Sequence, residues 1–221
     1  MTLLQCLERE PAGDANAAVI WMHGLGATSY DFYDIPPVLE LPAGLSPRFI
    51  FPQAPSIPVT LNYGMSMPAW YDIRSLETRN DDVEGIERSE AQIKALVDRE
   101  LERGVPANRI VIGGFSQGGA MALQTALRYP QRLAGVMVLS AYLLLAERIP
   151  GDASEANRDL PVFMAHGTHD PVVGYDKGER SRSHLEEHGW KVEWQAYPMA
   201  HQVVPQEIAD IADWLGRVLT A

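Results

Sequence analysis

Residues 109–123 read RIVIGGFSQGGAMAL, which is an apolar run, a glycine-rich turn and the start of an apolar helix. Gly114, Ser116 and Gly118 complete a G-x-S-x-G pattern in the turn. In such a strand–turn–helix segment the serine is held in a strained backbone conformation at the end of a strand, where only small neighbours fit. The N-terminus of the following helix directs its positive dipole at the hydroxyl. The segment therefore predicts an activated serine rather than a glycine-rich turn with a helix-capping serine.

Strand-length apolar runs alternate with helix-length segments on both sides of this turn. The expected strands are Ala18–Met22, Arg48–Phe51, Arg109–Gly113, Gly135–Leu139, Val162–Ala165 and Val192–Ala196. Nearly continuous apolar runs are typical of strands buried on both faces, and their alternation with helices indicates a mostly parallel sheet. The expected helices cover residues 82–103, a segment after Ser116, and residues 176–188 and 205–219; Asn80 or Asp81 is expected to cap the first. We expect a doubly wound α/β sheet in a single domain, residues 1–221.

Composition excludes several classes of function. The 221 residues suffice for one domain with a sizeable core, and 46% of them are hydrophobic. The 18 lysines and arginines against 29 aspartates and glutamates leave a net charge of −11, so the chain lacks the cations that neutralise nucleic-acid phosphates. An uninterrupted run of 18 apolar residues is missing, so integral membrane association is not expected.

The N-terminal segment predicts a protein of the cytoplasm. It has neither a basic start nor a long apolar stretch, so it is not expected to be a secretory signal, and it is interpreted as an edge strand. Cys6 is the only cysteine, which excludes an internal disulfide and a cysteine-built zinc site. We expect Cys6 to be a small packed residue.

An activated serine needs a base, and the base needs an orienting acid. In a fold of this kind the chain order is serine, acid, histidine. Asp170 follows the strand ending at 165, and His201 follows the strand ending at 196, each in a loop at the sheet edge where such folds carry their sites. Ser116, Asp170 and His201 are therefore expected to converge. Asp176 is the fallback acid, although it lies inside an expected helix.

Two backbone amides are expected to form an oxyanion hole, which stabilises the negative oxygen that develops in acyl transfer. One is the amide of Gln117, directly after the serine, and the other is that of Leu25 in the loop 23–26. The alternative for this loop is a plain connection between strand and helix. His23 is expected to brace the loop. A metal site from His166, His169 and Asp170 is not expected, because the three share a short turn.

Several segments together resemble one family of α/β-hydrolases. They are VIWMHGLGA (19–27), FPQAPSIPVT (51–60), MPAWYDI (67–73), GGFSQGGAMAL (113–123), LSAY (139–142), HGTHDPVV (166–173) and YPMAHQV (197–203). In this order they are similar to the phospholipase/carboxylesterase family, which includes small bacterial carboxylesterases and acyl-protein thioesterases. The resemblance implies the α/β-hydrolase fold, a triad of Ser116, Asp170 and His201, oxyanion donors at Leu25 and Gln117, and no cofactor or metal. The chain is too short for a large cap domain.

The segment from Phe51 to Ile73 holds four prolines among aromatics and methionines, which excludes a long helix or a central strand. Apolar side chains in and near this segment could line an acyl groove, or could simply pack beneath the loop. They are Tyr63, Met65, Met67, Trp70, Tyr71 and Tyr142. Bacterial members tend to carry two glycines after the loop asparagine, so Tyr63 here is expected to narrow the groove or change the loop.

The predicted function is a serine carboxylesterase that hydrolyses short-to-medium acyl esters through an acyl-enzyme intermediate. Acyl thioesters, including S-acylated protein cysteines, come second, and lysophospholipids third. A serine peptidase and a non-catalytic binding protein of the same fold are remote alternatives. The expected partner is a small-molecule acyl ester or thioester. An exposed apolar loop also makes a homodimer a reasonable expectation.

Overall fold

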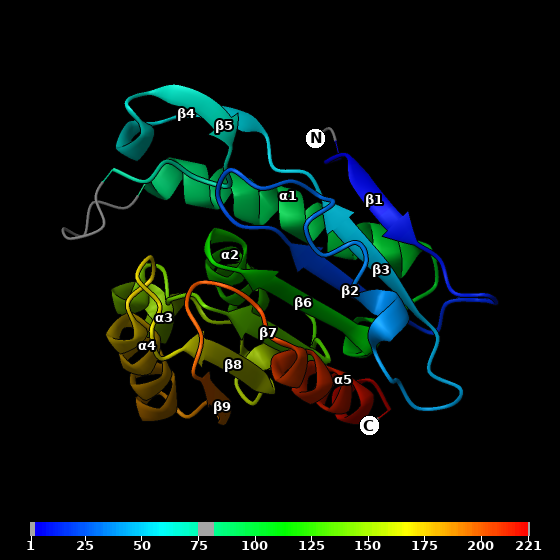
Figure 1. The fold of residues 1–221 in the computed structure, drawn as a ribbon. Coiled ribbons are helices and arrows are strands. Elements are labelled where there is room, and N and C mark those ends of the chain that lie inside the picture. Colours follow the sequence, from blue (N-terminus) through cyan, green and yellow to red (C-terminus); the bar gives the residue numbers. More distant parts are fainter. Residues whose placement is uncertain (1–2, 75–81, 221) are drawn as a thin grey trace.

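The computed structural model describes residues 3–74 and 82–220. Within these residues seven strands form one sheet in the order β1-β3-β2-β6-β7-β8-β9 (Figure 1). The strands are β1 (Cys6–Arg9), β2 (Ala17–Met22), β3 (Pro47–Pro52), β6 (Ile110–Phe115), β7 (Gly135–Leu139), β8 (Val162–Gly167) and β9 (Val192–Tyr197). Of the strands of this sheet, only the edge strand β1 pairs in antiparallel fashion, with β3. The prediction of a mostly parallel sheet is therefore confirmed.

Helices cover both faces of this sheet (Figure 1). They are α1 (Val83–Glu102), α2 (Gln117–Leu127), α3 (Ile149–Asp152), α4 (Tyr175–Glu187) and α5 (Pro205–Thr220). Along β2 alternate side chains enter two separate cores: Ile20 packs in the core shared with α1 and α2, and Trp21 in the core shared with α5. This alternation explains why β2 is apolar throughout, since neither face of the strand meets water.

The first helix begins at Val83 with Asp82 as its N-cap. The Asp82 carboxylate accepts a hydrogen bond from the Gly85 amide at 3.2 Å, which satisfies one of the free amides of the first turn. Asn80 and Asp81, which the sequence suggested as caps, lie outside the described residues. None of the described helices is long and apolar enough to cross a membrane.

The proline-rich segment forms a small hairpin outside the central sheet (Figure 1). Strand β4 (Ser56–Val59) pairs antiparallel with β5 (Met65–Pro68), and a short 3-10 turn covers Thr60–Asn62. Tyr63 follows in the left-handed region with φ of 54°. The segment thus contains no long helix or central strand, as predicted, although Phe51 and Pro52 still belong to β3.

Cys6 lies half-buried on the edge strand β1. Burial raises the pKa of its thiol to about 11, so the group is a neutral thiol at physiological pH. A neutral thiol is a poor nucleophile, and Cys6 therefore fits the packing role expected of it.

Candidate active site

Ser116 occupies the sharp turn between β6 and α2. Its backbone has φ of 55° and ψ of −121°, a conformation that costs a non-glycine residue about 1–3 kcal/mol. Two backbone hydrogen bonds hold it there: its amide donates to the Leu139 carbonyl at 2.8 Å, and its carbonyl accepts from the Ala120 amide at 3.0 Å. This backbone conformation places the Ser116 hydroxyl in the pocket rather than in the core.

Glycines surround this serine because backbone atoms occupy the space of a side chain. A Cβ on Gly114 would lie 2.4 Å from the Gly118 carbonyl, and one on Gly118 would lie 2.5 Å from the carbonyl oxygens of Met22 and His23. Contacts under 3.0 Å are essentially never seen for a Cβ. The glycines of the sequence pattern are therefore required by close packing of the turn against the end of β2.

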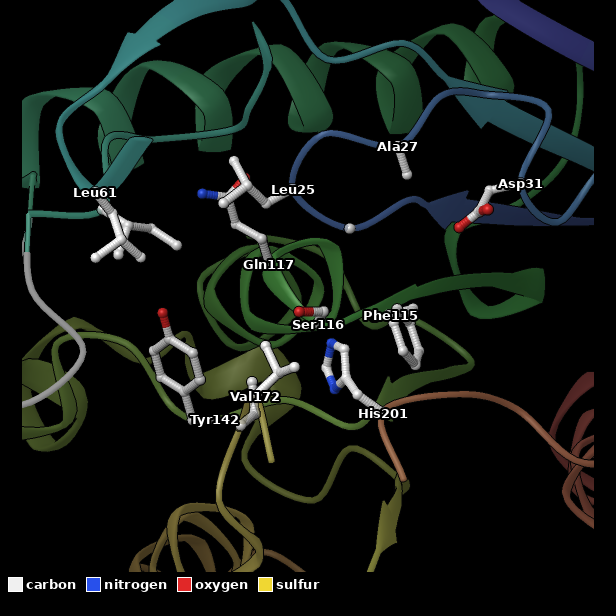
Figure 2. A pocket seen from close by; sticks show the side chains of 13 residues that line it. Leu25, Ala27, Asp31, Leu61, Phe115, Ser116, Gln117, Tyr142, Val172 and His201 are labelled. Carbon is white, nitrogen blue, oxygen red and sulfur yellow. The ribbon is translucent and has the colours of Figure 1, made fainter. Parts of the chain in front are cut away.

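Asp170 and His201 meet at the carboxyl edge of the sheet. His201 Nδ1 lies 2.6 Å from Asp170 Oδ2, and the Asp170 side chain is fully buried. The other carboxylate oxygen accepts from the amides of Val172 at 2.8 Å and Val173 at 2.9 Å. With Nδ1 donating to Asp170, Nε2 is the ring nitrogen free to accept a proton. Figure 2 shows a ring nitrogen of His201 facing the Ser116 hydroxyl.

The fallback acid lies elsewhere. Asp176 is in the first turn of α4, where it is exposed and pairs with Arg180 at 2.5 Å. The structure therefore brings Asp170, and not Asp176, to the imidazole of His201. Asp170 is held in this position by its short turn, because the amides of Val172 and Val173 both donate to its carboxylate.

The histidine at the end of β8 supports the acid loop. His166 is buried, and its Nε2 lies 2.9 Å from the Val173 carbonyl. Burial lowers its pKa, so the ring is neutral and donates this hydrogen bond. His166 thus connects both ends of the loop that carries Asp170.

No group of three or more side chains suited to a metal ion occurs in residues 3–74 and 82–220.

The loop after β2 approaches Ser116 closely. A Cβ on Gly24 would lie 3.3 Å from Ser116 Cβ. His23 is buried and braces the loop, because Nδ1 contacts the Gly24 carbonyl at 2.7 Å and Nε2 accepts from the Ala54 amide at 3.1 Å. Within the two described ranges, neither the Leu25 amide nor the Gln117 amide donates to a protein acceptor. Both residues line the same pocket as Ser116.

The side chain of Gln117 has a role that sequence reasoning missed. It is buried; its Oε1 accepts from the Trp70 amide and its Nε2 donates to the Tyr71 carbonyl, both at 2.8 Å. Trp70 is itself fully buried, and its Nε1 donates to the His23 carbonyl at 2.9 Å. These bonds attach the end of the hairpin to the serine turn. No sequence pattern signals them, because the partners are 46 and 47 residues apart.

A pocket of about 240 Å³ opens at Ser116 (Figure 2). The residues that line it are Gly24, Leu25, Ala27, Asp31, Leu61, Ile73, Phe115, Ser116, Gln117, Tyr142, Val172, Val173 and His201. Most are apolar, which suits an acyl chain. The Ser116 hydroxyl, the His201 imidazole and the buried Asp170 carboxylate lie next to one another in this order in space. This is the arrangement used for nucleophilic acyl transfer.

The expected groove residues fall in three different places. Tyr142 lines the pocket, and its hydroxyl lies 2.8 Å from that of Tyr71. Tyr71 and Trp70 are buried, at 3% and 0% exposure, and neither is among the lining residues. Trp70 therefore packs beneath the loop, which corrects the expectation that it forms the groove surface.

The exposed side of the hairpin carries the remaining expected residues. Tyr63 is 95% exposed and Met65 is 57% exposed, and neither lines the pocket. Met67 is half-buried and approaches Gly26, with its sulfur 3.7 Å from where a Cβ would stand. Tyr63 does not narrow this pocket, because its side chain is almost fully exposed to solvent and is not part of the lining.

Several apolar lining residues were missed, among them two from the proline-rich segment and two from the loop of Asp170. Leu61 lies in the turn between β4 and β5 and Ile73 lies after the hairpin, and the Leu61 amide donates to the Ile73 carbonyl at 2.9 Å. Val172 and Val173 follow Asp170 after Pro171 in the segment HGTHDPVV. Their position in that motif was the available signal, since functional residues are commonly carried on loops.

Proteins of known family resemble this chain both in sequence and in structure. The sequence model of the phospholipase/carboxylesterase family matches residues 8–219. Acyl-protein thioesterase 1 of Neurospora crassa is 44% identical, covering 92% of this chain and 87% of that protein. Acyl-protein thioesterase 1 of Yarrowia lipolytica is 42% identical over 94% of each chain. The crystal structure of Zea mays acyl-protein thioesterase 2 superposes with a TM-score of 0.86 at 30% identity, covering 97% of this chain and 99% of that one.

Proposed function

Because the chain belongs to the phospholipase/carboxylesterase family, we propose that it is an acyl-protein thioesterase, which releases a fatty acyl group from a protein cysteine. Membership makes the protein a carboxylic ester hydrolase of α/β-hydrolase fold. The finer proposal reverses the order reached from sequence alone, where simple esters came first. It is supported by the names of relatives at 42% and 44% identity, and the observation that carries it is an apolar pocket opening directly at Ser116.

In the first half-reaction, His201 Nε2 takes the proton of the Ser116 hydroxyl while its oxygen attacks the thioester carbonyl. The Asp170 carboxylate holds the imidazole through Nδ1 and stabilises its cation. The amides of Leu25 and Gln117 are the proposed donors to the negative oxygen of the tetrahedral intermediate. When the carbon–sulfur bond breaks, His201 gives its proton to the leaving sulfur, and the acyl group stays on Ser116.

In the second half-reaction, water replaces the thiol. His201 takes a proton from water as the water oxygen attacks the acyl carbon, and the same oxyanion donors act again. The bond to the Ser116 oxygen then breaks, His201 returns the proton to that oxygen, and the fatty acid leaves. The cysteine of the substrate is restored as a free thiol.

The choice of thioester is a question of leaving group and acyl fit. A cysteine thiol has a pKa near 8.5, well below that of an alcohol, so a thioester is the easier bond to break at the same site. The apolar lining of the pocket supplies binding free energy for the acyl chain, about 0.8 kcal/mol for each buried methylene.

The cytoplasmic location and the homodimer stay predictions.

The experiment compares two peptides of identical sequence, one with S-octanoyl cysteine and the other with O-octanoyl serine. We expect kcat/KM for the thioester to exceed that for the ester at least tenfold. Thiol release is followed with a disulfide reagent and fatty acid by mass spectrometry, with lysophosphatidylcholine as a third substrate. A higher kcat/KM for the ester, or for the lysolipid, would contradict the thioesterase proposal and restore the corresponding alternative.

A further inference from the structure

The pocket has two chemically different sides, and Ser116 lies between them. Figure 2 shows Leu61 and Tyr142 on one side of Ser116 and Asp31 beyond Ala27 and Phe115 on the other. The first side is apolar. The second contains the one aspartate or glutamate among the thirteen lining residues, all of which lie in the described part of the chain.

The Asp31 carboxylate is available to a ligand. Asp31 is exposed, and no lysine or arginine of residues 3–74 and 82–220 pairs with it. The nearby Asp34, by contrast, pairs with Arg9 at 2.8 Å. The backbone at Asp31 is held in place, because its amide donates to the Thr28 carbonyl at 3.0 Å. A carboxylate on a fixed backbone, without a cationic partner in the described residues, thus borders the reaction site.

The charge of Asp31 acts on the loop that carries the proposed oxyanion donor. Burial lowers the pKa of His23, whereas the charge of Asp31 acts in the opposite direction, which places Asp31 within electrostatic range of this loop. An unpaired negative charge there opposes the negative charge that develops on the reacting oxygen. A positive charge brought by the substrate would offset this opposition.

The acyl chain and the leaving group must occupy different sides of Ser116. An apolar chain gains most by covering the apolar side, and it would desolvate the carboxylate if it covered Asp31. The acyl chain therefore belongs with Leu61 and Tyr142, and the leaving cysteine and its neighbouring residues belong on the side of Asp31.

We propose that Asp31 is a specificity residue that favours leaving peptides in which lysine or arginine flanks the acylated cysteine. This inference rests on the proposed thioesterase function and names the substrate class within it. The net charge of −11 acts in the same direction at long range, because it raises the local concentration of cationic substrates. Asp31 adds the local contact that selects among them.

The test uses three S-octanoyl cysteine peptides that differ only in the flanking residues, which are lysine, glutamine or glutamate. They are hydrolysed by the full chain, by Asp31→Asn and by Asp213→Asn. Asp213 is an exposed residue of α5 outside the pocket lining, so its variant makes the same change in net charge at a distance. The measured quantity is the ratio of kcat/KM for the lysine peptide to that for the glutamate peptide.

We expect the unmodified protein to favour the lysine peptide about three- to tenfold, as befits a solvent-exposed charge pair. Asp31→Asn should bring the ratio close to that set by net charge alone, and Asp213→Asn should keep the ratio. High salt should reduce the preference, because exposed charges are screened.

Two results would overturn the inference while leaving the thioesterase proposal in place. One is an equal ratio in the unmodified protein and Asp31→Asn, and the other is an equal loss of preference in both variants. If the unmodified protein hydrolyses none of the three peptides, the thioesterase proposal fails, and the role of Asp31 fails with it.

Discussion

The turn that carries Ser116 and the β4–β5 hairpin both border the pocket, but they are built in opposite ways. A Cβ added to Gly118 in the turn would lie 2.5 Å from two carbonyl oxygens, whereas one added to Gly64 in the hairpin would meet no atom within 4 Å. The turn is packed backbone against backbone at the end of the central sheet. The hairpin is a ribbon of two short strands with exposed side chains, Tyr63 among them.

This contrast separates two functions. The proposed chemistry depends on atoms whose positions are fixed by contacts on every side, so any change there is felt. The acyl wall, by which we mean the side of the pocket with Leu61 and Tyr142 proposed to bind the acyl chain, is formed partly by the hairpin. Exposed side chains of the hairpin can change without disturbing the core. Trp70 marks the boundary: it is fully buried and its amide donates to the Gln117 side chain of the turn, while Met65, five residues earlier, is 57% exposed.

The strongest test of the contrast is Ser116→Ala. We expect kcat to fall by on the order of 10⁴–10⁶, because the proposed nucleophile is removed. Steady-state hydrolysis of an S-octanoyl peptide measures the effect. Ser140→Ala is the matched control, since Ser140 is likewise a serine with positive φ at a strand end, but it is buried and does not line the pocket. Substantial turnover by Ser116→Ala would exclude Ser116 as nucleophile.

The second change tests where the boundary lies. Trp70→Ala should lower the free energy of unfolding by about 3–5 kcal/mol, because a large buried side chain is removed. Its acyl-chain preference should stay as in the unmodified protein. Urea denaturation measures the stability, and Tyr63→Ala is the control with a change within about 0.5 kcal/mol. A shifted chain-length profile with unchanged stability would place Trp70 in the groove after all.

The third change introduces a methyl group into the packed turn. Gly118→Ala should destabilise the protein by about 2–4 kcal/mol and lower activity, because the turn must move away from the carbonyls of Met22 and His23. Gly13→Ala is the control, since its added Cβ meets no atom within 4 Å and its φ is not positive. Thermal unfolding compares the two variants. Equal stability would mean that the turn is less tightly packed than its geometry indicates.

The smallest effect is expected at the hairpin. Leu61→Ala should raise KM for an octanoyl thioester about three- to tenfold and leave kcat and stability nearly unchanged, because it removes apolar contact with the chain. Leu3→Ala is the control, as Leu3 is 45% exposed against 44% for Leu61 but does not line the pocket. Kinetics with butyryl and octanoyl thioesters show the change, and identical profiles for the two variants would remove Leu61 from the acyl wall.

Much of the fold followed from local patterns. The parallel strands were identified because most are nearly continuous apolar runs, and their ends differ from prediction by one or two residues, as at β6 and β9. The positions of Asp170 and His201 followed from the same patterns, since each lies in the loop after such a strand. The N-cap of α1 could not be assigned in this way, because several neighbouring polar residues are equally able to cap a helix.

The acyl wall was the part least accessible to local patterns. Trp70, Tyr71 and Tyr63 are all apolar or aromatic and close in sequence, yet two are buried and one is exposed. Residue type indicates a preference for burial, but not whether the partner is a core or a ligand. Leu61 and Ile73 become neighbours through a hydrogen bond between the middle and the end of the proline-rich segment.

The sequence by itself determined the sheet, the serine turn and the order of the three reactive side chains, because apolar periodicity and the steric demands of glycine act over a few residues. Only the tertiary structure decided which side chains line the pocket, how the Gln117 side chain joins the hairpin to the turn, and that Asp31 lies across Ser116 from the apolar wall. These features depend on how segments far apart in the chain pack against one another, and no local pattern encodes that packing.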